Sequence, residues 1–259
     1  MKTMSDKRIC TLMYHDVYDV SNKESGINLD SNYPYKIQRK AFEEQIKALS
    51  EYVESHGVDK DYIRLSFDDG GVSFYSIIMP VLEKYGFKGY FFIATSFIGQ
   101  DGFLTEQMIK EMHSRGHVIG GHSHTHRQRM HTLPLEDLEN DWKECIDTLN
   151  RITGEHTHIV SLPNGFESKR IFKTLCLLGV KDVYTSEPFE KPKHHDSLNV
   201  FGRYGIRNAM TINYVLAIAF NNKTKNKIRY KKAVLNLLKK IMGNNYITIR
   251  EKIFEAKHS

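Results

Sequence analysis

The organisation of this chain is set by one stretch, Ile63-Arg64-Leu65-Ser66-Phe67-Asp68-Asp69-Gly70-Gly71. Its first five residues alternate apolar and polar side chains, which predicts a strand, and the Asp-Asp-Gly-Gly sequence that follows predicts a tight loop. A helix is expected from about residue 73 to residue 85, and Gly86 suits the left-handed position just past its end. The nearly continuous apolar run over 88–94 then predicts a buried strand. This part of the chain therefore forms a strand, a helix and a second strand.

The same alternation continues along the chain. Apolar residues at helical spacing predict further helices at 39–55, 105–116, 134–152 and 168–178. Short apolar runs predict further strands at 117–119, 158–161 and 182–185. Regular alternation of this kind indicates an α/β fold with a mainly parallel sheet, open or closed into a barrel. In both arrangements the chemistry collects at the carboxyl ends of the strands.

The composition is that of an ordinary globular protein. The chain has 259 residues, of which 40% are hydrophobic and 26% charged, and no run approaches the ~18 apolar residues of a membrane-spanning helix. No Gly-, Ser- or Pro-rich linker divides it, so we expect one domain with a C-terminal extension. The first residues lack the apolar core of a secretion signal, which favours a cytoplasmic location. Three cysteines without Cys-x-x-Cys spacing indicate neither a disulfide framework nor a thiolate zinc cluster.

Positive charge is concentrated late in the chain. The formal net charge is +6, and lysines and arginines are dense between Lys223 and Lys240. Such a segment can meet an anionic membrane, an acidic glycan or nucleic acid. The interpretation that we favour is a solvated helix whose apolar stripe packs on a core. That stripe consists of Val234, Leu237, Leu238, Ile241 and Met242.

Histidines give the densest chemical signal. Six of the thirteen lie between His113 and His131, and His122, His124 and His126 directly follow the strand expected at 117–119. Neutral imidazole is the commonest metal ligand, and His122 and His126 can face the same way in a helical or an extended segment. The alternative is a polar surface turn in which the histidines are solvated.

A pair of aspartates lies at the corresponding place on the earlier strand. Asp68 and Asp69 are adjacent carboxylates that repel each other, and a cation held between them and other donors offsets that cost. The alternative is an ordinary Asp-Asp-Gly turn, because Asp bonds its own backbone and Gly supplies a positive φ. One carboxylate together with two imidazoles gives three ligands and leaves positions open for water, which is the pattern of a catalytic metal site.

These residues resemble the motifs of the polysaccharide deacetylase, or NodB-homology, family. Ser66-Phe67-Asp68-Asp69-Gly70 is similar to the first motif, His122-Ser123-His124-Thr125-His126 to the second, and Leu162-Pro163-Asn164-Gly165 to the third. The opening Leu12-Met13-Tyr14-His15-Asp16-Val17 resembles a segment of a branch that acts on exported polysaccharides. The likeness covers residues 9–207, and 208–259 is then a basic helical extension packed on the same domain.

The resemblance implies an irregular (β/α) barrel of about seven mainly parallel strands with a helical C-terminal extension. It also implies that Asp68 is the general base and that Asp69, His122 and His126 hold one divalent metal ion, most often zinc. Metal-bound water would attack an N-acetyl group of an amino-sugar polysaccharide or its precursor, with the ion polarising the carbonyl. A general acid must then protonate the leaving amine.

The third motif departs from the family pattern. Many members carry an arginine there that orients the base, whereas this chain has Ser161 and Leu162 before its proline. Asn164 stands at a position that is aromatic in the family pattern. Arg203 is expected to replace the missing arginine, and Asn164 and Arg203 are the residues that we expect to bind substrate or orient the base.

The usual general acid is also missing, because the only histidine after Arg203 is the terminal His258. The Tyr-His-Asp opening implies His15 as the substitute, and the alternative is a buried histidine bonded to backbone at the end of a first strand. His194 and His195 are the next candidates. His124, between the two proposed ligands, is expected to support the site or face the substrate.

Several functions stay open on these residues. A hydrolase of another non-peptide C–N bond in a small amide would keep the same site. An iron(II) oxygenase also uses two histidines and one carboxylate, although adjacent aspartates on an α/β pattern argue against it. A degenerate homologue that only binds a glycan would explain the missing arginine and late histidine. The expected partners are an N-acetylated glycan and, through the basic helix, the surface of an anionic membrane, whereas no aromatic and basic interleaving points to nucleic acid.

Overall fold

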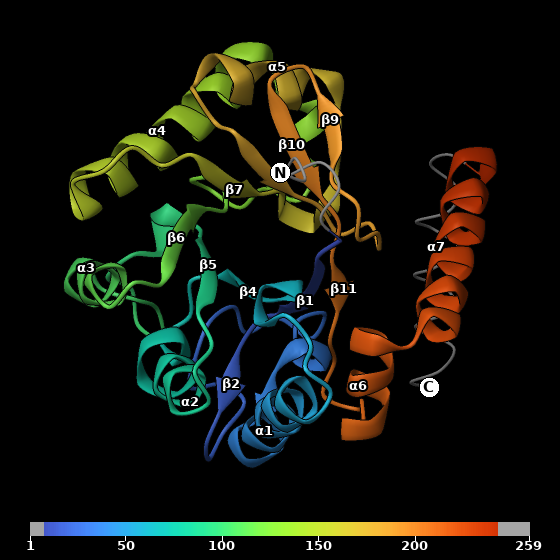
Figure 1. Ribbon diagram of the computed structural model, residues 1–259. Coiled ribbons are helices and arrows are strands. Elements are labelled where there is room, and N and C mark those ends of the chain that lie inside the picture. The colour runs from blue at the N-terminus through green and yellow to red at the C-terminus, as the bar shows by residue number, and fades with distance from the viewer. Residues whose placement is uncertain (1–7, 243–259) are drawn as a thin grey trace, which may run out of the picture.

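The computed structural model describes residues 8–242, and its centre is one strongly curled sheet (Figure 1). Nine strands pair in the order β11-β1-β4-β5-β6-β7-β8-β10-β9, and every neighbouring pair is parallel except β10 and β9. Their bounds are β1 Cys10–Tyr14, β4 Ile63–Asp69, β5 Gly89–Ile93, β6 Val118–Gly121, β7 Ile159–Ser161, β8 Asp182–Tyr184, β9 Lys193–His195, β10 Leu198–Phe201 and β11 Tyr204–Gly205. β2 (Val17–Tyr18) and β3 (Ile37–Gln38) form a separate parallel pair. The mainly parallel barrel architecture implied by the resemblance is confirmed.

One stretch of chain crosses from the strand next to one edge of the curled sheet to the strand at the other edge. Residues 198–201 pair with β8 as β10, and residues 204–205 pair with β1 at the opposite edge as β11. Gly202 lies in the step between them, where a Cβ would come within 2.5 Å of the Phe189 carbonyl oxygen. The next residue, Arg203, is thereby carried into the middle of the barrel, where it is fully buried.

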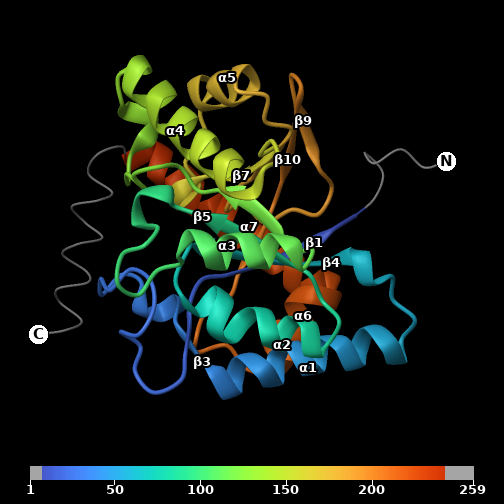
Figure 2. The same cartoon turned by 90° about the vertical axis from the view of Figure 1, so that its left-hand side faces the viewer.

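The helices lie around the outside of the sheet (Figures 1 and 2). Thr105 and Ser168 cap α3 and α5 by accepting backbone N–H bonds from Met108 and Ile171, as such residues do at helix starts. The helices predicted between residues 39 and 178 are present, and the one expected at 73–85 begins with a π-helical turn. The helices are α1 Arg39–Ser55, the π-helical η4 Phe74–Ile78, α2 Met79–Lys84, α3 Glu106–Ser114, α4 Leu135–Thr153 and α5 Lys169–Leu177. Short 3-10 turns are η2 Tyr33–Tyr35, η3 Lys60–Tyr62, η5 Thr95–Phe97, η6 Met130–Thr132 and η7 Pro163–Gly165.

The alternation in β4 divides its side chains between two environments. Phe67 faces the helices and is fully buried, with its ring stacked on Tyr14 at 5.6 Å and on Phe91 at 5.1 Å between centroids. Burying a side chain of this size stabilises the fold by about 1.5–3 kcal/mol. Because side chains alternate along a strand, Ser66 and Asp68 face the interior of the barrel instead. β4 therefore anchors the core with one face and presents Asp68 inside the barrel with the other.

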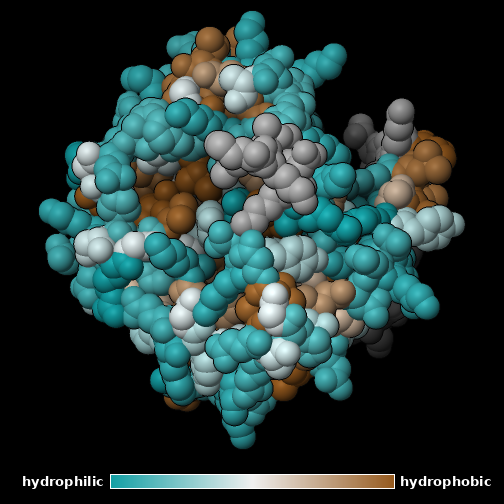
Figure 3. All heavy atoms as spheres, viewed as in Figure 1, coloured by the Kyte–Doolittle hydropathy of each residue, from teal (hydrophilic) through white to brown (hydrophobic). Residues whose placement is uncertain are grey.

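Aromatic rings fill part of that interior. The Tyr184 ring lies 5.1 Å from Phe92 and 4.9 Å from Phe201, and these rings form a cluster separate from the core beneath the helices. On the face of the molecule seen in Figure 1, the surface is hollowed and apolar residues line the hollow (Figure 3). The barrel is thus packed in its middle and hollowed on this face.

Two helices follow the barrel, α6 (Ile212–Phe220) and α7 (Asn222–Met242). The first turns of α7 are fixed by Glu190, whose carboxylate binds the Lys225 ammonium at 2.8 Å and the Arg229 guanidinium at 2.6 Å. Burial raises the pKa of Glu190, but hydrogen bonds from Lys225, Tyr62 and Arg8 outweigh it and hold that pKa at about 2. Within residues 8–242, none of the helices combines the length and the apolar character needed to cross a membrane.

The prediction that the apolar stripe of α7 packs on the core is wrong for the residues whose side chains are described. Val234, Leu237 and Leu238 are exposed, and Ile241 is 71% exposed. The inward side of the helix carries polar groups instead, because Lys225 and Lys232 bind Glu190 and Glu187. The Met242 side chain and residues 243–259, also part of the expected extension, lie outside what the structure describes.

Candidate active site

Two aspartates end β4 at the carboxyl edge of the sheet. Asp68 and Asp69 are each 3% exposed. Asp69 has a left-handed backbone with φ 91°, followed by Gly70 with φ 94°. A non-glycine residue in this region costs of order 1–3 kcal/mol, so the surrounding structure must hold it there. The strained turn points the two neighbouring carboxylates into one buried site.

The histidine segment follows β6, two strands along the sheet. Register aligns Asp69 with Ile93 and Ile93 with Gly121, so the next residue, His122, comes to the same edge. A Cβ on Gly121 would lie 2.8 Å from the Cys145 sulfur, which explains why only glycine fits immediately before His122. His126 has φ 52°. The loop turns back on itself, and the centroid of the His126 ring comes within 5.0 Å of the centroid of the His122 ring.

The aspartate and histidine segments meet at Asp69. Its Oδ1 lies 3.4 Å from His122 Nε2 and 3.2 Å from His126 Nε2, and the three donor atoms lie within 4.8 Å of one another. Oxygen and nitrogen ligands at ~2.0–2.2 Å from a tetrahedral ion are about 3.3–3.6 Å apart. The three donors therefore fit one divalent ion.

The protonation of these groups is shaped by their contacts. Burial raises the pKa of Asp69, but hydrogen bonds from His122 and His126 outweigh it and place that pKa well below its ordinary value. Burial lowers the pKa of His126, and the Asp69 carboxylate reverses this and raises it. Asp69 is therefore an anionic ligand at neutral pH.

The proposed ligands are held by a further layer of contacts. His122 Nδ1 lies 2.9 Å from the Ser161 carbonyl oxygen, which fixes the ring with Nε2 directed at Asp69. Asp141 accepts hydrogen bonds from the backbone N–H groups of His124 and Thr125 at 2.8 and 3.2 Å. His124 Nδ1 lies 2.9 Å from the Thr95 hydroxyl. These contacts fix the backbone and ring orientations of the histidine segment.

Asp141 was not predicted from the sequence. It is a buried acid on α4, on the same face as Leu138 and Trp142. The sequence carried one signal that could have identified it, an aspartate among the apolar positions of an amphipathic helix. A buried carboxylate at such a position requires hydrogen-bond partners.

Asp68 is bound by a guanidinium that comes from the other end of the chain. Arg203 donates from Nη1 to Oδ1 at 2.6 Å and from Nη2 to Oδ2 at 2.8 Å, a two-pronged pair. Ser161 completes the group, since its hydroxyl donates to Asp68 Oδ2 at 3.2 Å and accepts from Arg203 Nη2 at 2.7 Å. Burial raises the pKa of Asp68, but the charges of Arg203 and His122 outweigh it and lower that pKa. The structure thus places Arg203 against the carboxylate that the sequence analysis assigned as the base.

The Tyr-His-Asp segment ends β1, directly beside β4. Tyr14 aligns with Phe67, so His15 comes level with Asp68, and the charge of His15 contributes to the low pKa of both Asp68 and Asp69. Its Nδ1 is buried and has no hydrogen-bond partner within residues 8–242. The backbone-bonded role given as the alternative is therefore not seen at this nitrogen.

The other sequence candidates lie further away. Asn164 is exposed at the rim after β7, with φ 56°, and none of the described hydrogen bonds joins its side chain to Asp68 or the histidines. His194 lies in β9 and lines a different cavity, and the His195 ring contacts Phe172. Of the candidates for a general acid, the structure places His15 beside the aspartates.

Replacing Arg203 by glutamine is expected to lower kcat/KM for the hydrolysis that the resemblance implies. The expected loss is about 10- to 100-fold, the usual effect of removing a residue that orients a catalytic group. Loss of the positive charge raises the pKa of Asp68, so a higher pH is needed to ionise it. The acid limb of the pH–rate profile should therefore move to higher pH, with partial recovery in Arg203→Lys. Arg151→Gln, at an exposed arginine of α4, is the matched control. An unshifted profile in Arg203→Gln would contradict the assigned role.

The chain is similar to known polysaccharide deacetylases. The family model described as "Polysaccharide deacetylase" matches residues 55–183. The putative polysaccharide deacetylase YxkH of Bacillus subtilis is 25% identical over 202 residues, covering 73% of this chain and 68% of that protein. Peptidoglycan-N-acetylmuramic acid deacetylase PdaA of B. subtilis is 29% identical over 129 residues, 49% of this chain and 47% of that protein. The chain thus aligns with about half the length of PdaA.

Solved structures share the fold. Streptococcus pyogenes deacetylase PplD, determined in complex with acetate, superposes with a TM-score of 0.68 at 21% identity, covering 82% of this chain and 98% of that one. IcaB from Ammonifex degensii gives 0.65 at 21% identity, covering 82% and 96%. The segment matched by the family model contains both aspartates and the histidine segment, whereas His15 and Arg203 lie outside it.

Proposed function

The chain belongs to the polysaccharide deacetylase family, and we propose that it is a metal-dependent hydrolase that removes N-acetyl groups from an amino-sugar polysaccharide or its precursor. The observation that carries this proposal is the convergence of four buried or nearly buried side chains from the end of β4 and the loop after β6. Asp69, His122 and His126 form one donor set, and Asp68 Oδ2 lies 3.9 Å from His122 Nε2. The resulting site has three ligands with a base immediately beside them.

The residues of the chain divide the steps of amide hydrolysis among them. A divalent ion held by Asp69, His122 and His126 supplies a Lewis acid for the amide carbonyl and makes water more acidic. Asp68 accepts the proton of the attacking water, and Arg203 and Ser161 hold its carboxylate ionised and oriented. His15 then donates a proton to the leaving nitrogen as the C–N bond breaks. The products are acetate and a free amino group on the sugar.

We propose zinc as the ion. Two imidazoles and one carboxylate are a common ligand set for catalytic zinc, which keeps the remaining positions open. The same set also accepts iron, cobalt or manganese, with affinity rising along the divalent series. Elemental analysis of protein purified without added metal, followed by activity measurement after reloading with each ion, distinguishes them.

The function is tested by measuring acetate release from N-acetylated chito-oligosaccharides, peptidoglycan fragments and small acetamides. We expect release from a glycan, loss of activity in a chelator and recovery when zinc is restored. Activity confined to small acetamides would instead support the alternative hydrolase of another non-peptide C–N bond. Glycan binding without acetate release under any metal would support a degenerate binding homologue and overturn the proposal.

We also propose that the outer side of α7 contacts an anionic membrane. Tyr230, Leu237 and Ile241 are exposed on this helix, and exposed lysines accompany them at positions 223, 227 and 231. Apolar residues flanked by lysines favour binding at an anionic lipid surface. The protein should co-sediment with vesicles of phosphatidylglycerol and should stay in the supernatant with vesicles of phosphatidylcholine. Leu237→Ser should lower the fraction that co-sediments, whereas Leu177→Ser, at an exposed leucine of α5, should not. Equal co-sedimentation in all cases would contradict the proposal.

The cytoplasmic location expected from the sequence stays a prediction, which cell fractionation tests.

A further inference from the structure

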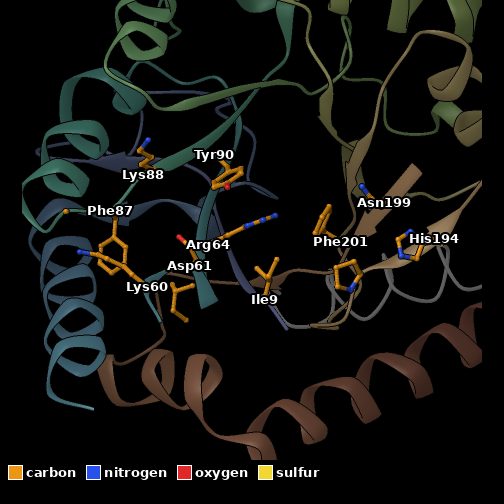
Figure 4. A pocket seen from close by; sticks show the side chains of 13 residues that line it. Ile9, Lys60, Asp61, Arg64, Phe87, Lys88, Tyr90, His194, Asn199 and Phe201 are labelled. Carbon is orange, nitrogen blue, oxygen red and sulfur yellow. The ribbon is translucent and has the colours of Figure 1, made fainter. Parts of the chain in front are cut away.

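A cavity lies at the opposite end of the strands from the aspartates. Its volume is about 370 Å³, within the range of small-molecule sites. It is bounded by the starts of β4 and β5 and by β9 and β10 (Figure 4). None of the proposed active-site residues lines it. The six lining residues that matter here are Lys60, Arg64, Phe87, Lys88, Tyr90 and Phe201.

Arg64 is the central feature of this cavity. Its side chain extends from β4 into the space between Tyr90 and Phe201 (Figure 4), with the guanidinium carbon 5.2 and 5.0 Å from the two ring centroids. Its one described hydrogen bond runs from Nη1 to the Tyr184 hydroxyl. A guanidinium has five N–H donors. Among residues 8–242 no carboxylate forms an ion pair with it, so most of its donors are left for a ligand.

The remaining lining defines the chemistry of that ligand. Lys60 and Lys88 lie with Phe87 at one end of the cavity (Figure 4), and Asp61 is the single acid among the lining residues. Lys60 Nζ donates to the Tyr85 carbonyl oxygen, and both lysine ammonium groups are turned away from Arg64 (Figure 4). The cation that faces the cavity is therefore the Arg64 guanidinium, which favours an anion. The Phe87, Tyr90 and Phe201 rings offer apolar and aromatic contact for the body of the ligand.

We propose that this cavity is a binding site for a small anion with an aromatic body, an aryl phosphate or aryl carboxylate. The anionic group binds the free N–H donors of Arg64, and the aromatic body lies along the ring-lined wall. Planar guanidinium donors match both carboxylate and phosphate oxygens, so the two classes share one mode of recognition.

The site is independent of the proposed hydrolase function. Arg64 and Asp68 lie four residues apart on β4, which corresponds to about 13 Å along a strand. Ser66 and the packed Tyr184 ring lie in between. A ligand at Arg64 therefore does not occupy the substrate position, and the proposal can fail without affecting the function proposed above.

Calorimetric titration of the full chain with phenyl phosphate and with phenylacetate tests the site. Benzyl alcohol supplies the aromatic body without charge, and inorganic phosphate supplies the charge without the body. We expect at least one aryl anion to bind about tenfold or more tightly than either control, as a charge-assisted contact adds to apolar burial. Tighter binding of phenyl phosphate than of phenylacetate would identify a phosphate ligand, and the reverse a carboxylate. Equal binding of benzyl alcohol, or no binding of either anion, would overturn the proposal.

Two variants locate the binding. Arg64→Gln should weaken it about tenfold or more, whereas Arg151→Gln on the surface of α4 should not change it. His194→Trp narrows the other end of the cavity at an exposed position without touching Arg64, and it should also weaken binding. If Arg64→Gln does not fold, the affinity of the His194→Trp variant decides whether the anion binds in this cavity. Unchanged affinity in every folded cavity variant would place the anion elsewhere and contradict the assignment.

Discussion

Asparagine in place of Asp68 is expected to lower the rate of acetate release by about 10³-fold, within the range that a general base contributes. The amide keeps the shape of the carboxylate, but it does not accept the proton of the attacking water. Asp69, His122 and His126 are unchanged, so the metal content per chain should equal that of the parent protein. Steady-state rates and elemental analysis on the same preparation measure both quantities.

The Asp68→Asn variant has a second expected consequence. Arg203 is buried and loses its counter-charge, and breaking a buried ion pair on one side costs about 3–5 kcal/mol. Rates must therefore be compared well below the unfolding temperature of each protein. Asp147→Asn, at an exposed acid of α4, is the matched control. Full activity in folded Asp68→Asn would show that Asp68 takes no part in the chemistry. Loss of metal from this variant would show that Asp68 is a metal ligand.

Alanine in place of His122 is expected to remove the metal and, with it, the activity. The donor set falls from three side chains to two, and the ion contributes several kcal/mol of transition-state stabilisation. Each 1.36 kcal/mol is a factor of ten in rate, so the loss should be at least about 10³-fold. Metal content after dialysis and acetate release are measured together.

His124→Ala is the matched control for His122→Ala. His124 lies two residues away, but its described ring contact is with Thr95 and it is not part of the donor set. The His124→Ala variant should therefore keep its metal, whatever the effect of the substitution on substrate turnover. Retention of metal and activity by His122→Ala, or loss of metal by His124→Ala, would mean that the histidine segment binds through different residues.

Much of the fold follows from local sequence patterns. Strand β4 and helix α1 are recognisable because apolar residues recur at the period of their own secondary structure. The donor set was predictable for a similar reason, since the two segments that supply it both follow parallel strands and must share an edge of the sheet. The short strands β9, β10 and β11 carry too few residues for such a pattern and were not predicted.

Contacts between distant segments were harder to predict. Arg203 reaches Asp68 across 135 positions of sequence because the step between β10 and β11 crosses from the strand next to one edge of the sheet to the strand at the other edge. Charge and position alone suggested Arg203, and only the strand order explains the contact. The apolar stripe of α7 shows the opposite case, because the periodicity of a helix identifies an apolar side but not what covers it.

The central claim, that Asp69, His122 and His126 hold one ion, is tested most directly by anomalous diffraction at the zinc edge from crystals of the zinc-loaded chain. We expect a single strong peak about 2.0–2.2 Å from Asp69 Oδ1, His122 Nε2 and His126 Nε2, with Asp68 beside it and bound to Arg203. A peak elsewhere in the molecule, with these three side chains apart or bound to protein groups, would contradict the claim.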